Sequence, residues 1–333
     1  MTRRRLEEIL DRIRTLRIGV VGDFCIDAYW QLDTGAAEDS LETGKPTHAV
    51  RSQRYTPGGG GNVAANLAAL GTGTVRAFGV IGPDMFGREL DSLLRQRGID
   101  TSAMVVQDSD WETPVYAKPY LGEIEGERID FGRWNRMRSE AALEGLLRSA
   151  MPLLDALVVN QQLEAGVHTP ALVRTLNQLA ADFSRIPFVL DARTRTSSFL
   201  NMISKLNAAE ALRLASQAGE VPPGDPRAAL RRNARAIGAR SRKPVFVTRG
   251  AEGILVFDGE EFTDVPALPL RGPVDSVGAG DTTVSAIAAT LASGGTLKEA
   301  AEMGNLAAAV TVKKRGETGT ATGAEVLEVS RIS

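Results

Sequence analysis

Short apolar runs alternate with amphipathic stretches along most of the chain. Between Leu6 and Leu16, apolar residues recur every three or four positions, which predicts an amphipathic helix. A compact apolar run, Arg17–Asp23, follows and is typical of a buried strand. Further strand-like runs are Val75–Gly82, Ala156–Asn160, Pro187–Asp191, Val245–Thr248 and Ile254–Phe257. Stretches with a helical pattern include Gly87–Arg97, Thr169–Phe183 and Ala208–Ala218. This alternation predicts an α/β fold with a doubly wound, mainly parallel sheet flanked by helices.

Two segments, residues 28–56 and 111–133, break this alternation. They are rich in polar residues, and their strand-like parts carry too many polar side chains on one face for buried parallel strands. These parts are Thr47–Tyr55, Pro114–Leu121 and Glu127–Arg133. The Pro- and Gly-rich stretch 219–227 is interpreted as a loop and not as a linker between domains, because sequence motifs continue on both sides of it. We therefore expect one domain over residues 1–333, with the two polar segments inserted in it.

Composition narrows the class of protein. The 333 residues are 43% apolar and 24% charged, which suits a globular protein with a sizeable core. A formal net charge of −2 gives no basic surface for nucleic acid. No apolar run approaches the ~20 residues of a membrane span, and no signal-peptide pattern follows the first residues. The single cysteine, Cys25, excludes an internal disulfide framework. We expect a cytoplasmic protein without nucleic-acid or membrane partners.

The segment Pro273–Thr282 carries the strongest chemical signal. The small-residue apolar run after it is typical of a buried helix, so Gly278, Ala279 and Gly280 are expected at a helix N-terminus. Backbone N–H groups there have no helical partner, and the helix dipole favours a phosphate. Asp281, beside such an anion site, fits a base that takes a proton from a hydroxyl group attacking a phosphoryl group. A glycine turn capped by an aspartate is the alternative.

A second glycine cluster lies in residues 57–71, where four consecutive glycines precede Asn62 and an alanine-rich stretch. Ordering four glycines is costly, so we expect either a backbone close to a ligand or a positive φ. Asn62 is placed either to cap the helix that follows or to offer its amide to a hydroxyl-rich substrate.

Together these segments resemble the two signature regions of the PfkB family, the ribokinase-like carbohydrate kinases. The segments that carry the resemblance are Val20–Asp27, Pro57–Gly71, Gly79–Gly87, Asn207–Glu210, Val247–Gly250 and Pro273–Thr282. The resemblance implies a ribokinase-like fold and transfer of a phosphoryl group from ATP to a sugar. It also implies that the two polar segments form a small antiparallel β lid over the sugar, often shared across a homodimer.

The resemblance assigns a role to each candidate residue. Asp281 would be the catalytic base, with Gly278, Ala279 and Gly280 as the anion hole for the γ-phosphoryl group. The residues expected to bind the sugar are Asp27, Gly58, Gly59 and Asn62. A carboxylate such as Asp27 accepts hydrogen bonds from neighbouring hydroxyl groups. An aspartate in a turn at a strand end is the alternative for Asp27.

The resemblance also implies ATP and magnesium as cofactors. The residues expected to line the nucleotide are Asn207, Thr248, Gly250 and Asn305. Because Mg²⁺ prefers oxygen ligands and keeps several waters, Glu210 is expected to orient one of those waters. A helix N-cap with an acid in the first turn explains the Asn207–Glu210 spacing equally well. Asp275 is a candidate ligand for a monovalent cation such as K⁺, as in some relatives, with an N-cap role as the alternative.

Within the family, Val20–Trp30 and the glycine-rich region look most like the kinases of heptose 7-phosphate, from ADP-heptose synthesis. A phosphorylated acceptor needs cations, and guanidinium groups bind phosphate well. The arginines available are Arg128, Arg133, Arg136, Arg138, Arg193 and Arg195. The alternative is that these arginines form a solvent-exposed charged surface and bind no phosphate. Residues 34–45 lack these kinases' usual lid pattern, so fructokinase, ribokinase, ketodeoxygluconate kinase and nucleoside kinase specificities stay open, as does a sugar- or nucleotide-binding sensor without turnover.

Overall fold

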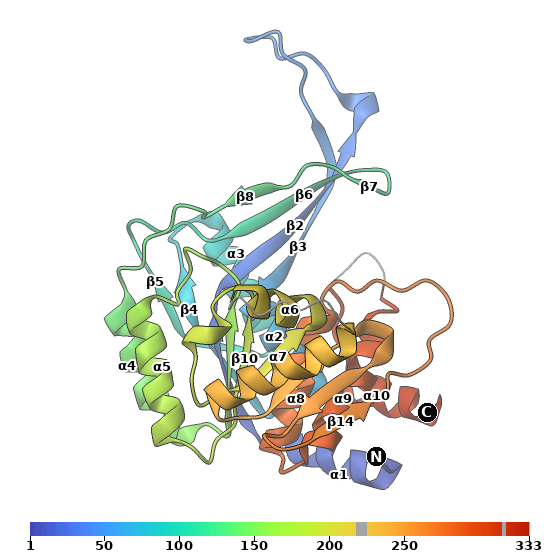
Figure 1. Ribbon diagram of the computed structural model, residues 1–333. Coiled ribbons are helices and arrows are strands. Elements are labelled where there is room, and N and C mark those ends of the chain that lie inside the picture. Colours follow the sequence, from blue (N-terminus) through green and yellow to red (C-terminus); the bar gives the residue numbers. More distant parts are fainter. Residues whose placement is uncertain (218–224, 315–317, 333) are drawn as a thin grey trace.

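The larger of two β-sheets forms the centre of the molecule. The computed structural model describes residues 1–217, 225–314 and 318–332 (Figure 1). Among them, the larger sheet has nine strands in the order β14-β13-β12-β11-β10-β9-β1-β4-β5. These strands are β1 (Arg17–Gly22), β4 (Thr74–Ile81), β5 (Asp100–Val106), β9 (Ala156–Gln161), β10 (Phe188–Ala192), β11 (Ile203–Asn207), β12 (Val245–Thr248), β13 (Ile254–Phe257) and β14 (Phe262–Val265). All neighbouring strands from β12 to β5 are parallel. The pairs β12–β13 and β13–β14 are antiparallel. The predicted mainly parallel sheet is confirmed.

Helices cover both faces of this sheet, which explains why its strands are apolar on both sides. Within β1, Val20 points into one core and Val21 into the opposite one. The first core is covered by α1 (Arg3–Ile13), α2 (Gly60–Leu70), α3 (Met85–Gln96), α8 (Ala279–Ala292), α9 (Leu297–Thr311) and α10 (Gly323–Val329). The other face carries α4 (Glu140–Ala150), α5 (Pro170–Asp182), α6 (Ala208–Gln217) and α7 (Pro226–Ser241). No helix of the described residues is both long and apolar enough to cross a membrane.

The predicted elements agree with the structure except at their ends. The helix expected from Leu6 to Leu16 ends at Ile13, because the chain must turn before β1. Residue 218, the predicted end of another helix, and residues 219–224 of the predicted loop lie outside the described residues, and α7 begins at Pro226.

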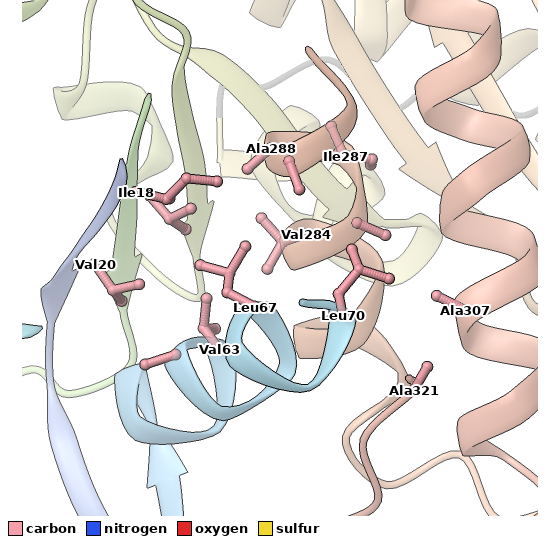
Figure 2. Close-up of a cluster of buried hydrophobic side chains, with 14 of the residues drawn as sticks. Ile18, Val20, Val63, Leu67, Leu70, Val284, Ile287, Ala288, Ala307 and Ala321 are labelled. Atoms are coloured by element: carbon pink, nitrogen blue, oxygen red, sulfur yellow. The ribbon is translucent and has the colours of Figure 1, made fainter. Parts of the chain in front are cut away.

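Helices α2 and α8 pack side by side on β1, and small residues make this close approach possible. Figure 2 shows Val63 and Leu67 of α2 beside Val284 and Ala288 of α8. The N-terminal ends of the two helices meet at one place near the carboxyl edge of the sheet, where Asn62 of α2 is hydrogen-bonded to Asp281 of α8. In open α/β sheets, ligands bind at this edge, outside the carboxyl ends of the strands.

The second sheet is the predicted lid, with strand order β3-β2-β6-β7 and β8 paired to β6. Its strands are β2 (Phe24–Asp33), β3 (Ala49–Gly59), β6 (Val115–Leu121), β7 (Ile124–Glu125) and β8 (Ile129–Phe131). The hairpin of β2 and β3 extends far from the body of the molecule (Figure 1). Most strand pairs of this sheet are antiparallel as predicted, and the exception is β2 with β6, which run parallel. Much of the first half of the fold lies between them in sequence, and such a long crossover permits parallel pairing.

Asp23 joins the lid to the main sheet. It is the one residue between β1 and β2, and its side chain is only 2% exposed. The carboxylate accepts hydrogen bonds from the backbone N–H groups of Gln162 and Leu163 at 2.8 Å and of Val167 at 2.9 Å. Its carbonyl accepts the N–H of Gly60 at 2.9 Å. Asp23 therefore fixes the loop after β9 and the start of α2 against the point where the lid begins.

Replacing Asp23 by Asn should destabilise the protein, because an amide directs N–H groups toward backbone donors that need an acceptor. We expect the free energy of unfolding at pH 7 to fall by about 3 kcal/mol in urea titrations followed by circular dichroism. Asp182→Asn, at an exposed position of α5, is the matched control and should change stability by less than about 0.5 kcal/mol. Equal stability of the two variants would contradict this role of Asp23.

Candidate active site

Helix α8 begins where the sequence predicts. Its N-cap, Gly278, has a φ of 78°, a conformation that a side chain would strain. The N–H of Ala279 donates to the carbonyl of Ser276 at 3.2 Å, so this group is already used. The role of Ala279 in the anion hole stays a prediction, and an anion there would compete with Ser276 for this N–H group. The N–H groups of Gly280 and Asp281 lie in the first turn, have no acceptor in the helix, and carry the positive end of its dipole.

The carboxylate of Asp281 lies in this first turn and accepts a hydrogen bond of 2.6 Å from the side-chain amide of Asn62. Burial and the negative charge of Asp191 raise the pKa of Asp281 to about 6. The amide of Asn62 and the charges of Lys205 and Arg193 act in the opposite direction. An aspartate with such a pKa is largely ionised at pH 7 and is a stronger base than an ordinary carboxylate.

A row of polar residues crosses the carboxyl edge of the sheet beneath Asp281. Asn160 of β9 pairs with Asp191 of β10, which pairs with Lys205 of β11. The ammonium group of Lys205 lies 3.0 Å from both carboxylate oxygens of Asp191, and both residues are buried. A Cβ at Gly280 would lie 3.1 Å from Nζ of Lys205. This pair thus borders the N-terminus of α8, on the face where an anion is favoured.

Sequence reasoning missed Lys205 and did not assign Asp191 beyond its place at a strand end. A usable signal was present, because a lysine inside the apolar run of β11 is rarely buried without a partner. Asn160 was missed as well. Its amide is buried and has no hydrogen-bond partner among the described residues.

The glycine cluster forms the end of β3 and the start of α2. Gly59, the N-cap, has a φ of 55°, and a Cβ there would lie 2.3 Å from the carbonyl oxygen of Asp23. The expected positive φ is confirmed at this position. Asn62 is the third residue of α2, and its side chain makes no capping bond. The helix-cap alternative for Asn62 is therefore wrong, because the amide points across to Asp281.

Asp27 lies in the middle of β2 rather than in a turn at a strand end, so that alternative is wrong as well. Its Oδ1 is 2.9 Å from Nζ of Lys118, which comes from the neighbouring strand β6. A Cβ at Gly58 would lie 2.8 Å from the Oδ2 of Asp27. A glycine at position 58 therefore keeps the space beside this carboxylate open.

Cations and aromatic rings alternate on the face of the lid that carries Asp27. The guanidinium of Arg54 is 4.2 Å from the centre of the Tyr29 ring, and the ammonium of Lys118 is 4.8 Å from it. Arg128 lies 4.3 Å from the centre of the Tyr116 ring. Residues two apart in a strand share a face, so these side chains form one surface. Sequence reasoning missed Lys118 and Arg54.

The six arginines proposed for phosphate binding do not form one cluster. Arg138 pairs with Asp110, and Arg195 donates to the backbone carbonyls of Glu164 and His168. These two guanidinium groups are therefore already paired with groups of the protein itself. Arg128 forms a two-point ion pair with Asp130, and Arg133 and Arg136 are exposed. Arg193 is exposed directly after β10, and its charge acts on Asp281 and on Tyr116 in the lid.

Three of the four residues expected at the nucleotide meet in one cavity. This cavity of about 380 Å³ is lined by Asn207, Thr248 and Gly250, with Arg227 and Arg249 beside them. Asn207 and Thr248 are direct partners on the parallel strands β11 and β12. Their side chains therefore reach the carboxyl edge of the sheet next to Lys205.

Asn305 is not brought to this cavity. Its amide donates to the carbonyls of Val265 and Pro266, at 3.1 and 3.0 Å, and ties α9 to the segment after β14. It borders a separate cavity of about 190 Å³ near the start of α1. Sequence reasoning could not detect this, because position 305 is helical in either case and only the packing of α9 determines which way its side chain points.

The candidate metal residues have local structural roles. The N–H of Asn207 donates to Glu210 at 2.9 Å, and the N–H of Glu210 donates to Oδ1 of Asn207 at 2.8 Å. Oδ1 of Asp275 accepts the N–H of Val277 at 3.0 Å. Among the described residues, no three His, Cys, Asp or Glu side chains gather as a metal site. A single carboxylate fits an ion such as Mg²⁺ that is held mainly by phosphate oxygens and water.

Comparison with known proteins agrees with this geometry. Residues 18–322 match the family model of the pfkB family carbohydrate kinases. The bifunctional protein HldE of Hyphomonas neptunium is 30% identical over 322 residues, which cover 96% of this chain. The match spans 64% of that relative, so this chain corresponds to less than two thirds of its length.

Solved structures share the fold. Phosphofructokinase-2 of Escherichia coli in complex with potassium superposes with a TM-score of 0.73 at 21% identity, covering 95% of this chain and 99% of that one. A ribokinase of Arabidopsis thaliana complexed with ribose and ATP gives a TM-score of 0.72 at 19% identity, covering 96% and 100%. At these identities the similarity shows a ribokinase-like fold.

Proposed function

This chain belongs to the pfkB family of carbohydrate kinases, and we propose that it transfers the γ-phosphoryl group of ATP to a hydroxyl group of a sugar phosphate. The observation that carries the proposal is the position of Asp281: a carboxylate with a raised pKa at a helix N-terminus, near a buried lysine and hydrogen-bonded to the amide of Asn62. On this proposal, the main sheet and the lid act as one kinase unit.

Asp281 would accept the proton of the acceptor hydroxyl group as that oxygen attacks the γ-phosphorus. The new bond joins the acceptor oxygen to phosphorus, the bond between the γ-phosphorus and the β–γ bridging oxygen breaks, and ADP leaves with the electron pair. Asp27, Gly58, Gly59 and Asn62 would line the acceptor side. Donors aimed at the developing charge account for much of such catalysis. Here they are the N–H groups of Gly280 and Asp281 together with the ammonium group of Lys205.

On the nucleotide side, Asn207, Thr248 and Gly250 would line ATP in the cavity of about 380 Å³. Glu210 would orient a water of Mg²⁺, which neutralises charge on the phosphates when bound. Asp275, in the turn before α8, is our proposal for a monovalent-cation ligand such as one for K⁺. Its bond to the N–H of Val277 is compatible with this, because a carboxylate accepts several hydrogen bonds or ligands at once.

Asp281→Asn should lower kcat by about 1,000-fold and leave ATP affinity within a few-fold of the wild type, because only the proton acceptor is lost. In the wild type, kcat/KM should fall below pH about 6, where Asp281 becomes protonated. ADP release and calorimetric titration with ATP measure the two effects. Asp182→Asn serves as the control and should match the wild type in both. A fully active Asp281→Asn variant would exclude Asp281 as the base.

We propose heptose 7-phosphate, or a sugar phosphate of similar shape, as the acceptor. The support is the cationic and aromatic face of the lid, which carries Lys118, Arg54 and Arg128, together with the exposed Arg193, whose charge acts on Tyr116 of that face. The relatives named HldE and the resemblance to heptose 7-phosphate kinases agree with an anionic acceptor. Guanidinium groups bind phosphate in a forked geometry that an uncharged sugar does not need.

ADP release should be measured on heptose 7-phosphate, fructose, fructose 6-phosphate, ribose, ketodeoxygluconate and adenosine. We expect turnover on a phosphorylated sugar, and Arg193→Ala should raise its KM by about 10-fold because a phosphate contact is lost. Arg138→Ala removes an exposed arginine that is already paired with Asp110, and it should leave KM unchanged. Preference for an uncharged sugar or a nucleoside would contradict the proposed acceptor. Nucleotide binding without any turnover would favour a sensor.

We also propose a homodimer formed through the lid. Leu32, Val50 and Leu121 are direct cross-strand neighbours on the face opposite Asp27, and Val50 and Leu121 are exposed there. Leu41, at the tip of the hairpin, is fully exposed. Sedimentation should give twice the 35.5 kDa of one chain, and Val50→Asp with Leu121→Asp should give the monomer. A wild-type monomer at tens of micromolar would overturn this proposal.

A further inference from the structure

A chain of hydrogen bonds leads through the α2–α8–α9 interface to Asp281. The side-chain amide of Asn66 donates to Oδ1 of Asn62 at 3.3 Å and to the Asn62 carbonyl at 2.9 Å. The hydroxyl of Thr282 donates to Oδ1 of Asn66 at 2.8 Å. The hydroxyl of Thr311 lies 3.1 Å from that of Thr282. Three helices, of which α2 is distant in sequence from α8 and α9, thus contribute to one polar path.

The chemistry of these groups fixes the direction of the chain. The backbone carbonyl of Asn62 can only accept a hydrogen bond, so the NH₂ group of Asn66 points to Asn62 and its Oδ1 faces the hydroxyl of Thr282. Because Oδ1 of Asn62 accepts this bond, the NH₂ group of Asn62 is the end that faces Asp281. A reversed Asn62 would place an amide oxygen beside the carboxylate, which only a protonated Asp281 could satisfy.

This hydrogen-bond chain is unusual because its side chains are buried. Asn66 is 2% exposed, while Thr282 and Thr311 are each 1% exposed, within a core that is otherwise apolar. A buried polar group without a partner costs about 1–3 kcal/mol, so such groups persist when each is satisfied. Thr290, about two turns along α8 from Thr282, offers the contrast: it is fully buried, and its hydroxyl has no partner among the described residues.

We propose that Asn66, Thr282 and Thr311 are positioning residues that hold the amide of Asn62 with its NH₂ group toward Asp281. They touch neither acceptor nor nucleotide in this assignment and act through Asn62 alone. The role of Asp281 as a base rests on the proposed function, whereas the orientation of Asn62 does not.

Removing the hydrogen-bond chain should make Asp281 harder to ionise, because the hydrogen bond donated by Asn62 lowers the pKa of this carboxylate. The other charged and titratable groups that act on or near Asp281 are Asp191, Lys205, Arg193 and Cys25. None of them makes a hydrogen bond to Thr282 in this structure. A substitution at Thr282 therefore changes the hydrogen-bond chain and leaves these charges in place.

The test is a direct titration of Asp281 by carbon-13 NMR of labelled aspartate carboxyl groups in the full chain, with Asp281→Asn identifying the resonance. Thr282→Val keeps the shape and removes the hydroxyl, and it should raise the titration midpoint by at least about 0.5 pH unit. Thr282→Ser retains the hydroxyl and should restore the wild-type midpoint. Thr290→Val, a matched loss of a buried hydroxyl on the same helix, should leave the midpoint unchanged.

An unchanged midpoint in Thr282→Val, or an equal shift in Thr290→Val, would overturn the proposal. Thr282→Val leaves Oδ1 of Asn66 without a donor, which can make the variant unstable. The double variant Asn66→Leu with Thr282→Val removes both polar groups. It should recover stability and keep the raised midpoint. A wild-type midpoint in that stable double variant would mean that the chain only supports packing. These readouts need no acceptor, so failure of the proposed kinase reaction would be seen separately, as absence of ADP release by the wild type.

Discussion

A carboxylate enclosed where two helices begin is the constraint that organises this molecule. Taking the charge of Asp281 out of water is unfavourable unless donors and cations surround it. The α2 helix supplies the amide of Asn62 at 2.6 Å, and the sheet supplies Lys205. Asn62 reaches Asp281 because α2 and α8 lie side by side on β1 (Figure 2). The packing of the core and the chemistry of the site are thus one arrangement.

The parallel sheet contributes the electrostatic part. Its strands end at a common edge, so one residue from each of three neighbouring strands forms the row of Asn160, Asp191 and Lys205. The two charges of this row act on Asp281 in opposite directions: Asp191 raises its pKa and Lys205 lowers it. Their buried pairing holds the ammonium group beside Gly280, where the positive end of the helix also lies. Phosphate chemistry fits this edge better than any other part of the described structure.

The lid combines two surfaces on one sheet. Alternation along β2 gives one face to Ile26 and Ala28, which pack into the core, and the other to Asp27 and Tyr29. Asp23, between the two sheets, accepts three backbone N–H groups and also binds the start of α2 through its carbonyl. The lid, the loop after β9 and the first turn of α2 are therefore fixed to one another, and the polar face of the lid has a defined position.

What the sequence determined by itself is local. Apolar spacing predicts the strands and helices, the four glycines before Asn62 indicate a positive φ or a backbone close to a ligand, and the pattern places Asp281 at the start of a helix. Partners distant in sequence were decided only by the tertiary structure. The Asn62–Asp281 bond joins positions 219 residues apart, and the parallel pairing of β2 with β6 depends on a long crossover. Spacing fixes which face of an element a side chain occupies, whereas the element that this face meets depends on how all the elements pack together.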